Sequence, residues 1–200
     1  MEGRSVKRIL ILLVLLMLTG CAAAPKPTEP VETGSVSSDG VAEGTKLGQK
    51  VPDFAVTTVE GEELLLSEIL AEKKLVVLNF WFADCSWCVK EFPVLELAYS
   101  RYREDVEVLA LTPYDTRDVA ADFADERGLS FPVATCYESF ARDFGVNGYP
   151  TSVFIDREGR ISLVHTGAIT DPNTFYKVFD AYTAEAYTHS TYYQISELVK

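Results

Sequence analysis

The sequence predicts an α/β fold in which a central mixed β-sheet is flanked by helices. Two apolar runs without helical periodicity, at residues 75–81 and 106–111, have the character of strands that are buried on both faces. Helix signals follow each run, and strands separated by helices favour parallel pairing. Residues 151–156 and 161–166 flank Glu158-Gly159 and predict a final hairpin, which adds antiparallel strands. The sheet is therefore expected to be mixed.

Three longer helices are indicated by the residues at their ends. One is expected from Ser86 to Tyr102. The next should run from Thr116 to Arg127, because Gly128 supplies a stop. The last should begin at Asp171-Pro172, because proline suits the first helical position. Its core-facing stripe, at helical spacing, is Phe175, Phe179 and Tyr182.

Short elements are expected between these longer ones. Residues 55–58 and 64–66 predict an N-terminal β-hairpin, and Ser67 is a candidate cap for a short helix after it. Thr135 and Glu138 have the spacing of a capping box, which predicts a helix starting at Thr135.

The helix predicted at Thr135 would place Cys136 at a helix N-terminus, where the pKa of a thiol falls. Cys136 is therefore interpreted either as a second redox thiol or as a spare, partly buried one.

The composition limits the classes of function. Of 200 residues, 48% are hydrophobic and 24% are charged, which excludes a chain that is disordered throughout or spans a membrane many times. The formal net charge of −12 makes binding to nucleic acid unexpected, because an acidic surface repels phosphates. Four cysteines are too few for a disulfide-dense small fold, so their positions must decide their role.

Residues 1–20 have the pattern of an export signal. A basic start precedes an unbroken apolar run at residues 9–18, which is shorter than the ~20 apolar residues that a membrane-spanning helix needs. Leu18-Thr19-Gly20-Cys21 resembles the bacterial lipobox, which implies cleavage before Cys21 and lipid attachment to its sulfur. A plain secretory signal and an uncleaved anchor are the alternatives.

A flexible tether is expected after the lipidated cysteine, over residues 21–46. Residues 22–46 are rich in Ala, Pro, Thr, Glu, Gly and Ser and almost lack large apolar side chains, so they cannot form a core. The folded domain is expected over residues 47–200, with residues 183–200 as a C-terminal extension. Removing residues 1–20 takes away three basic side chains and one acidic one, which changes the net charge from −12 to −14.

The chemistry is predicted at Cys85-Ser86-Trp87-Cys88, which follows a buried strand and opens a helix. Free N–H groups and the helix dipole favour a thiolate at a helix N-terminus, so Cys85 should gain most and be the more exposed cysteine. Cys88 lies three residues on and shares a face with Cys85. The two sulfurs can therefore form a disulfide, and Cys88 can resolve a mixed disulfide on Cys85.

Half of a zinc site is the alternative interpretation of this pair. Zinc takes four ligands, and the other candidates are scattered along the chain. They are Cys136, His165 and His189. No metal is therefore expected.

Three segments resemble the membrane-tethered, thioredoxin-like lipoproteins of the TlpA/ResA type, within the redoxin superfamily. Residues 77–93, VLNFWFADCSWCVKEFP, resemble the active-site segment of that family. Residues 51–54 resemble its opening segment, and residues 144–156 resemble its proline loop. The resemblance covers residues 47–182. It implies a thioredoxin-like fold, to which the N-terminal β-hairpin is an extension, and extracytoplasmic thiol–disulfide exchange without a cofactor.

The resemblance assigns roles to individual residues. Cys85 matches the attacking thiol and Cys88 the resolving one. Pro150 matches the cis-proline that faces the disulfide, and the backbone before it can pair with an extended substrate. Trp87 and Tyr149 are the expected apolar contacts to substrate beside the disulfide.

Glu91 matches an acidic residue that the family places near the buried cysteine. A partly buried carboxylate with a raised pKa can accept the proton of Cys88 during resolution. Asn79 stands where ordinary thioredoxins carry a buried aspartate, so Glu91 would take over its task. The alternative is that Glu91 is only a surface residue of the helix.

Two residues beside the cysteines depart from the family pattern. Asp84 stands where an aromatic residue is usual; its charge would either raise the thiol pKa or be solvated. Trp87 stands where proline is common, so the reduction potential of the family cannot be carried over.

The sequence thus predicts a monomeric protein-disulfide reductase, anchored by lipid to a bacterial membrane. It would reduce disulfides in exported proteins with electrons from a membrane donor, in cytochrome c maturation or in support of another exported enzyme. A redoxin-type peroxidase is one alternative, although residues 80–85 lack the Pro-x-x-x-Thr-x-x-Cys pattern. A copper-delivery protein or chaperone is another, although copper delivery in this fold uses wider cysteine spacing. The direction of electron flow stays open, because it follows potential and partner.

Overall fold

The computed structural model describes residues 40–188 and 195–199. The predicted signal segment, Cys21 and most of the predicted tether lie outside these residues, as does His189. Within the described ranges, every helix is too short or too polar to cross a membrane.

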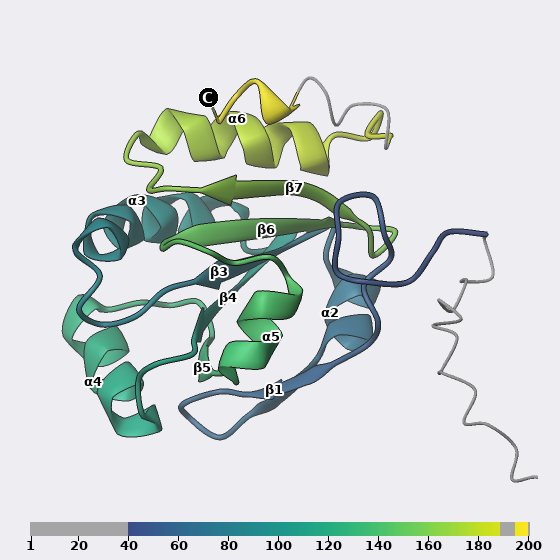
Figure 1. Ribbon diagram of the computed structural model, residues 1–200. Helices are drawn as coiled ribbons and strands as arrows, with labels where there is room; N and C mark the ends of the chain where they lie inside the picture. The colour runs from purple at the N-terminus through teal and green to yellow at the C-terminus, as the bar shows by residue number, and fades with distance from the viewer. Residues whose placement is uncertain (1–39, 189–194, 200) are drawn as a thin grey trace, which may run out of the picture. The chain divides into compact units, whose positions relative to one another are not determined.

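A five-stranded mixed sheet forms the centre of the domain (Figure 1). Its strands are β3 (Leu75–Phe80), β4 (Val106–Thr112), β5 (Val133–Thr135), β6 (Thr151–Asp156) and β7 (Ile161–Thr166). Their order across the sheet is β5-β4-β3-β6-β7. β3 pairs in parallel with β4, and β4 with β5, whereas β6 is antiparallel to both β3 and β7. The mixed sheet and the final hairpin are therefore confirmed.

The central strand β3 has both faces covered. All six of its residues are buried. Leu75 and Val77 belong to the hydrophobic core on one side of the sheet, and Val76 and Leu78 to the core on the other. This explains why the sequence of the strand is apolar without alternation.

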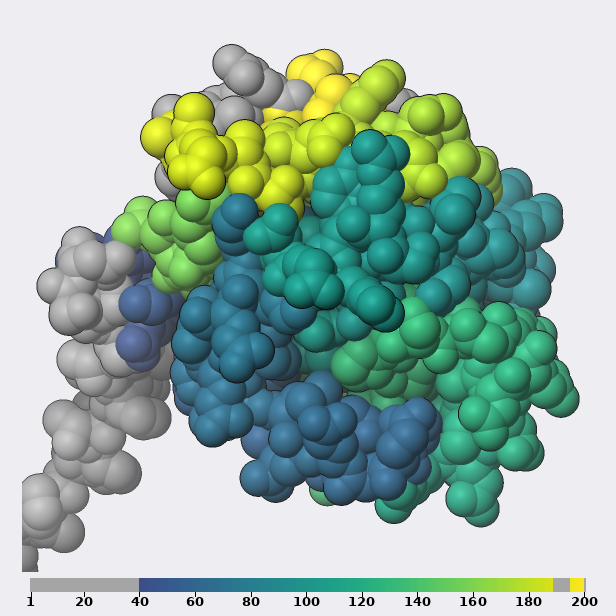
Figure 2. Space-filling model, turned by 180° about the vertical axis from the view of Figure 1, so that it is seen from behind, coloured from purple at the N-terminus to yellow at the C-terminus, as the bar shows by residue number. Residues whose placement is uncertain are grey.

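Five helices flank the sheet in the described part of the chain. They are α2 (Leu66–Glu72), α3 (Ser86–Tyr102), α4 (Arg117–Arg127), α5 (Glu138–Asp143) and α6 (Pro172–Thr183). Buried side chains of α3, α4 and α6 share one core, and those of α2 and α5 share the other. From behind, Figure 2 shows the yellow-green C-terminal part of the domain lying over its teal middle part, where α6 packs on α3.

The N-terminal hairpin is confirmed as a separate two-stranded sheet. It consists of β1 (Ala55–Thr57) and β2 (Glu63–Leu65), which pair antiparallel. The N–H of Val59 donates to the carbonyl of Val133 at 2.8 Å, which ties the hairpin to β5. The hairpin is therefore a separate sheet, which an isolated bridge between Thr58 and Ala134 connects to β5 of the central sheet.

The long helices begin and end where the sequence predicted. The bounds of α3 are those expected. Thr116 caps α4 by accepting the N–H of Val119, and Gly128 ends it with a left-handed φ of 59°. The side chain of Asp171 caps α6.

The cap predicted at Thr135 is wrong. Thr135 ends β5, where it pairs with Thr112 of β4, and α5 begins only at Glu138. The N–H of Cys136 also donates to the carbonyl of Thr112 at 2.9 Å. Thr135 and Cys136 therefore take part in the parallel pairing of β5 with β4, and their backbone cannot begin a helix.

The cap predicted at Ser67 is also wrong. Ser67 lies inside α2, and its N–H and hydroxyl donate to the carboxylate of Asp53 at 2.9 and 2.7 Å. Asp53, fourteen residues earlier in the chain, supplies the acceptor for the first turn of this helix.

Residues 42–45, which the prediction assigned to the tether, contact the folded domain. Lys50 exchanges backbone hydrogen bonds with Ala42 and Gly44 at 3.0 and 2.9 Å. The hydroxyl of Thr45 donates to the carbonyl of Asp143 at 2.6 Å. These contacts attach residues 42–45 to the folded domain.

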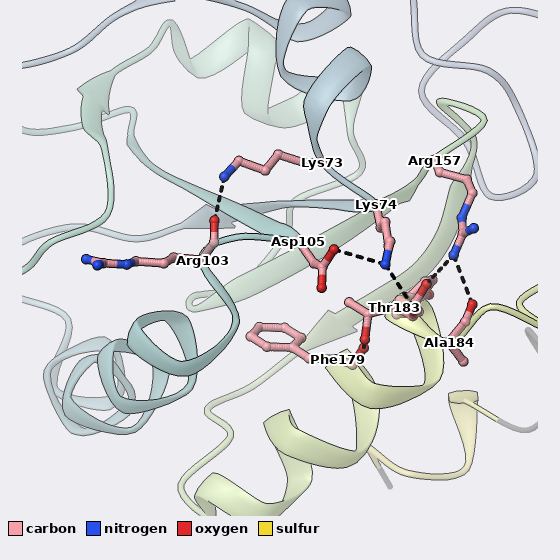
Figure 3. A network of polar contacts seen from close by, with 9 residues as sticks. Lys73, Lys74, Arg103, Asp105, Arg157, Phe179, Thr183 and Ala184 are labelled. Carbon is pink, nitrogen blue, oxygen red and sulfur yellow. Dashed lines mark hydrogen bonds and ion pairs between the residues drawn. The ribbon is translucent and has the colours of Figure 1, made fainter.

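Two basic side chains bind the C-terminal end of α6 (Figure 3). Lys74 pairs with Asp105 at 3.0 Å and donates to the carbonyl of Thr183. Arg157 donates to the carbonyls of Tyr182 and Ala184 at 3.0 and 3.1 Å. These donors satisfy carbonyl groups that a helix end leaves free.

The described parts of the predicted C-terminal extension pack onto the domain. The hydroxyl of Tyr187 donates to the buried carboxylate of Asp156 at 3.1 Å. Ile195 is fully buried in the core that α3 and α6 share.

Candidate active site

The candidate site is centred on a disulfide between Cys85 and Cys88 at the N-terminus of α3, the longest helix described. Cys85 is the N-cap residue, and its sulfur accepts the N–H of Cys88 at 3.1 Å. Cys85 is 6% exposed, and Cys88 is fully buried. The predicted order of exposure is confirmed. Once the disulfide is reduced, the same N–H group and the helix dipole would stabilise a thiolate on Cys85.

The loop before Cys85 is held by Asp115, which follows β4. One oxygen of the Asp115 carboxylate accepts the N–H of Ala83 at 2.8 Å and the hydroxyl of Thr112 at 2.6 Å. The carbonyl of Phe82 in turn accepts the N–H of Cys85 at 3.0 Å. Asp115 thus joins the end of β4 to the cysteine loop. The sequence did not predict this contact, because it depends on the alignment of β3 with β4.

Glu91 is fully buried on α3, so its interpretation as a surface residue is wrong. One carboxylate oxygen accepts the N–H of Ile169 at 3.3 Å, and the other accepts the side-chain amide of Asn79 at 3.5 Å. Burial outweighs these hydrogen bonds and raises the pKa of Glu91 to about 8. The raised pKa is therefore confirmed. Glu91 is three residues beyond Cys88, on the same face of the helix.

Two buried polar atoms on β3 and just after it lack a hydrogen-bond partner in the described part of the chain. They are Oδ1 of Asn79 and Nε1 of Trp81. The amide nitrogen of Asn79 does have a second acceptor, the hydroxyl of Ser152 at 3.0 Å. A protonated Glu91 carries a hydroxyl hydrogen, for which the free oxygen of Asn79 is an available acceptor.

The peptide bond between Tyr149 and Pro150 is cis, as the resemblance implied. Thr151, the next residue, pairs with Phe80 at the end of β3. Because Cys85 follows that same end of β3, the proline loop and the disulfide lie at one end of the sheet. The carbonyl of Pro150 accepts the N–H of Gly167 at 2.9 Å, which anchors the loop.

Trp87, Lys90 and Asp84, which lie beside the cysteines in the sequence, are on the surface. Trp87 is 56% exposed, and the Lys90 ammonium lies 4.1 Å from the centre of its ring. Asp84 is exposed, which fits its interpretation as a solvated carboxylate.

Cys136 is half-buried beside a surface hollow of about 370 Å³ that β1 and the start of α5 line. Burial raises the pKa of its thiol to about 12. The predicted fall in pKa is wrong, because Cys136 precedes the N-cap residue of α5 and lies outside the first helical turn.

We expect Cys136 to be an inert thiol. In the oxidised domain, its alkylation by iodoacetamide at neutral pH should be at least about tenfold slower than that of an unperturbed cysteine, because the thiolate is the reactive form. Mass spectrometry over a time course measures this rate. Alkylation as fast as that of free cysteine would contradict the burial of this thiol.

Of the three further zinc-ligand candidates, Cys136 and His165 lie in the described part of the chain, and His189 lies outside it. His165 lies half-buried on β7, and burial lowers its pKa. Among the described residues, no group of three or more His, Cys, Asp and Glu side chains is arranged to hold a metal ion.

A disulfide that opens a helix, with one sulfur more accessible than the other, can be reduced and re-formed without rearranging the fold. Its chemistry is that of the thiol–disulfide oxidoreductases, and the protein is an enzyme of this class.

Comparisons with known proteins agree with this class. The chain belongs to the AhpC/TSA family, whose profile matches residues 47–164. It is 36% identical over 121 residues to the thiol-disulfide oxidoreductase ResA of Bacillus thuringiensis (strain Al Hakam), which covers 60% of this chain and 69% of ResA. It is 34% identical over 131 residues to the thioredoxin-like protein YneN of Bacillus subtilis (strain 168), which covers 64% and 75% of the two chains.

The fold also matches solved structures. The crystal structure of StoA from Bacillus subtilis superposes with a TM-score of 0.54, covering 66% of this chain and 97% of StoA. The two chains are 22% identical, so this likeness shows the fold alone. The solution structure of a putative thioredoxin from Neisseria meningitidis is 27% identical, covers 70% of this chain and 94% of that chain, and superposes with a TM-score of 0.60, so the fold is thioredoxin-like.

Proposed function

We propose that the protein reduces disulfides in exported proteins, outside the cytoplasm, while lipid on Cys21 holds it at a bacterial membrane. The observation that carries the reductase chemistry is the buried carboxylate of Glu91, one helical turn from the buried sulfur of Cys88. This pairing suits a site that must deprotonate a resolving thiol. The 36% identity to a thiol-disulfide oxidoreductase supports the same chemistry.

The first step uses the reduced enzyme. The Cys85 thiolate attacks one sulfur of the substrate disulfide, whose S–S bond breaks as a mixed disulfide with Cys85 forms. The released substrate sulfur leaves as a thiolate and takes a proton from solvent. The N–H of Cys88, which points at the Cys85 sulfur, stabilises the attacking thiolate.

The second step resolves the mixed disulfide. Glu91 accepts the proton of Cys88, and the Cys88 thiolate attacks the Cys85 sulfur. The Cys85–Cys88 bond forms, and the second substrate sulfur is released. That sulfur leaves as a thiolate and takes the proton that Glu91 accepted from Cys88. The substrate has gained two electrons from the two cysteine sulfurs, and two protons, one from solvent and one from Cys88 by way of Glu91. A pKa near 8 for Glu91 is close to that of an ordinary thiol, so the proton can move in either direction.

A membrane-bound dithiol donor would reduce the Cys85–Cys88 disulfide by the reverse exchange. Lipid on Cys21 would keep the enzyme near such a donor. Replacement of Cys21 by alanine should abolish lipid attachment and, because cleavage before residue 21 depends on the same cysteine, should leave the signal segment on the protein. Incorporation of a labelled fatty acid into this variant, as into the wild type, would contradict the lipid anchor.

Substrate would bind along the proline loop, with Trp87, Tyr149 and Pro150 in contact with it. Across residues 40–188 and 195–199, the N–H and carbonyl of Tyr149 take no part in a backbone hydrogen bond. An extended segment could therefore pair with them as an added strand. An unfolded apocytochrome c and another exported enzyme are both substrates of this kind.

Insulin reduction by dithiothreitol tests the proposal. We expect the domain, acting as a monomer, to accelerate the reaction at catalytic concentration. Absence of turnover combined with tight copper binding would favour copper delivery, and rapid peroxide turnover would favour a peroxidase.

A further inference from the structure

We propose that Phe82, Tyr114 and Tyr149 form an aromatic platform that binds a large apolar side chain of the substrate, next to the cysteine under attack. This inference rests on the proposed function and adds a preference among its substrates. The three residues come from three separate loops, which follow β3, follow β4 and precede β6.

The rings contact one another in edge-to-face geometry. The ring centre of Tyr149 is 5.3 Å from that of Phe82 and 5.6 Å from that of Tyr114, and Phe82 and Tyr114 are 5.8 Å apart. Such contacts are favourable and geometrically specific. The three loops therefore present one continuous apolar surface.

Backbone contacts place the platform next to the cysteine loop and the proline loop. The carbonyl of Phe82 accepts the N–H of Cys85, and Tyr149 is joined directly to Pro150. A substrate segment that pairs with the backbone of Tyr149 would carry its side chains past these rings. The side chain beside the substrate cysteine is the one that would meet them.

Phe82 and Tyr149 are partly buried and pack against the core, whereas Tyr114 lies outside it. Asp115, the neighbour of Tyr114, is hydrogen-bonded to Ala83, the neighbour of Phe82. Tyr114 nevertheless leaves 56% of its surface exposed and belongs to neither hydrophobic core. A ring that is positioned without being buried is suited to bury its free face against a partner.

The charges around the platform favour an uncharged or basic occupant. Asp115 is hydrogen-bonded beside Phe82, and Glu138, which also pairs with Arg142 at 3.1 Å, acts electrostatically on Tyr149. Burial and the contact with Tyr114 raise the pKa of Tyr149. Its hydroxyl therefore stays neutral at physiological pH, so the surface remains apolar. The occupant that fits is an aromatic or large aliphatic side chain of an extended polypeptide.

Two probe peptides test this inference. Each has one cysteine in mixed disulfide with glutathione, and the residue before the cysteine is Phe in one and Ser in the other. Because burial against aromatic rings is favourable, the wild-type kcat/KM should be about tenfold higher for the Phe peptide. Tyr114→Ala should lower it about tenfold for the Phe peptide and less than twofold for the Ser peptide. Tyr114→Phe should keep the preference.

Leu97→Ala is the matched control, because Leu97 is also an exposed apolar residue, 52% exposed, further along α3. It should change neither rate. The platform would be overturned if Tyr114→Ala lowered kcat/KM equally for both peptides or did not lower it at all. It would also be overturned if the loss in Tyr114→Ala followed a change in the Cys85–Cys88 reduction potential. If the wild type reduces neither peptide, the proposed reductase function fails instead.

Discussion

Replacement of Cys85 by serine should abolish insulin reduction, with a loss on the order of 10³-fold or more, because a serine hydroxyl can neither attack a disulfide at neutral pH nor form one. Cys88→Ser should also stop turnover, but at a later stage. Its Cys85 remains able to attack, so a stable mixed disulfide with substrate should accumulate. Non-reducing electrophoresis and mass spectrometry detect that species.

Cys136→Ser is the matched control for these variants, because it removes a third thiol from the same domain. It should retain full activity, since Cys136 is half-buried and its pKa is raised. Activity that survives in Cys85→Ser, or disappears in Cys136→Ser, would place the redox centre elsewhere.

Glu91→Gln should slow the resolution of the mixed disulfide by a factor on the order of 10², the contribution expected from a positioned general base. The substitution keeps the shape of the side chain, and its amide can donate to the free oxygen of Asn79. Stopped-flow measurement of the release of the second substrate thiol separates this step from the first attack. The wild-type rate should depend on pH around 8, and this dependence should be lost in the variant.

Glu104→Gln is the control for this experiment, because Glu104 is exposed beyond the end of α3. It should leave both the rate and its pH profile unchanged. The same result for Glu91→Gln would show that Glu91 is not the base.

The raised pKa of Glu91 also predicts how stability depends on pH. Glu91 titrates near 8 in the folded protein and near 4.5 when unfolded, so between these values the folded state retains a proton that the unfolded state has lost. The free energy of unfolding of the oxidised wild type should therefore fall as pH rises through this window. Glu91→Gln removes this dependence and should be the more stable protein above pH 8, by on the order of 5 kcal/mol.

Urea unfolding of the oxidised proteins below pH 4.5 and above pH 8 measures this difference. The two proteins should differ least at the lower pH, where wild-type Glu91 is neutral in both states. A stability difference that does not change with pH would contradict the buried carboxylate.

The elements that could be predicted from sequence are those defined by their own residues. The apolar run of β3 lies buried on both faces, and the following helix begins at Ser86, immediately after Cys85. The cis bond at Pro150 followed from family resemblance alone. Each of these features is carried by a short continuous segment.

The features that could not be predicted depend on pairing between distant segments. Thr135 carries a capping signal, yet its alignment with Thr112 makes it part of a strand. Because that strand excludes a helix start, the pKa of Cys136 moves in the opposite direction from the one expected. The bond from Ala83 to Asp115, and the position of Tyr114 that follows from it, likewise depend on the sheet bringing two loops together.

The reduction potential of the Cys85–Cys88 pair tests the central claim most directly. It is measured at pH 7 by equilibrating the domain with defined ratios of oxidised and reduced dithiothreitol and counting free thiols. A reductase of exported proteins should have a value near the reducing end of the known range, about −270 mV. A value near −120 mV would contradict this account, because such a pair would oxidise substrate dithiols rather than reduce their disulfides.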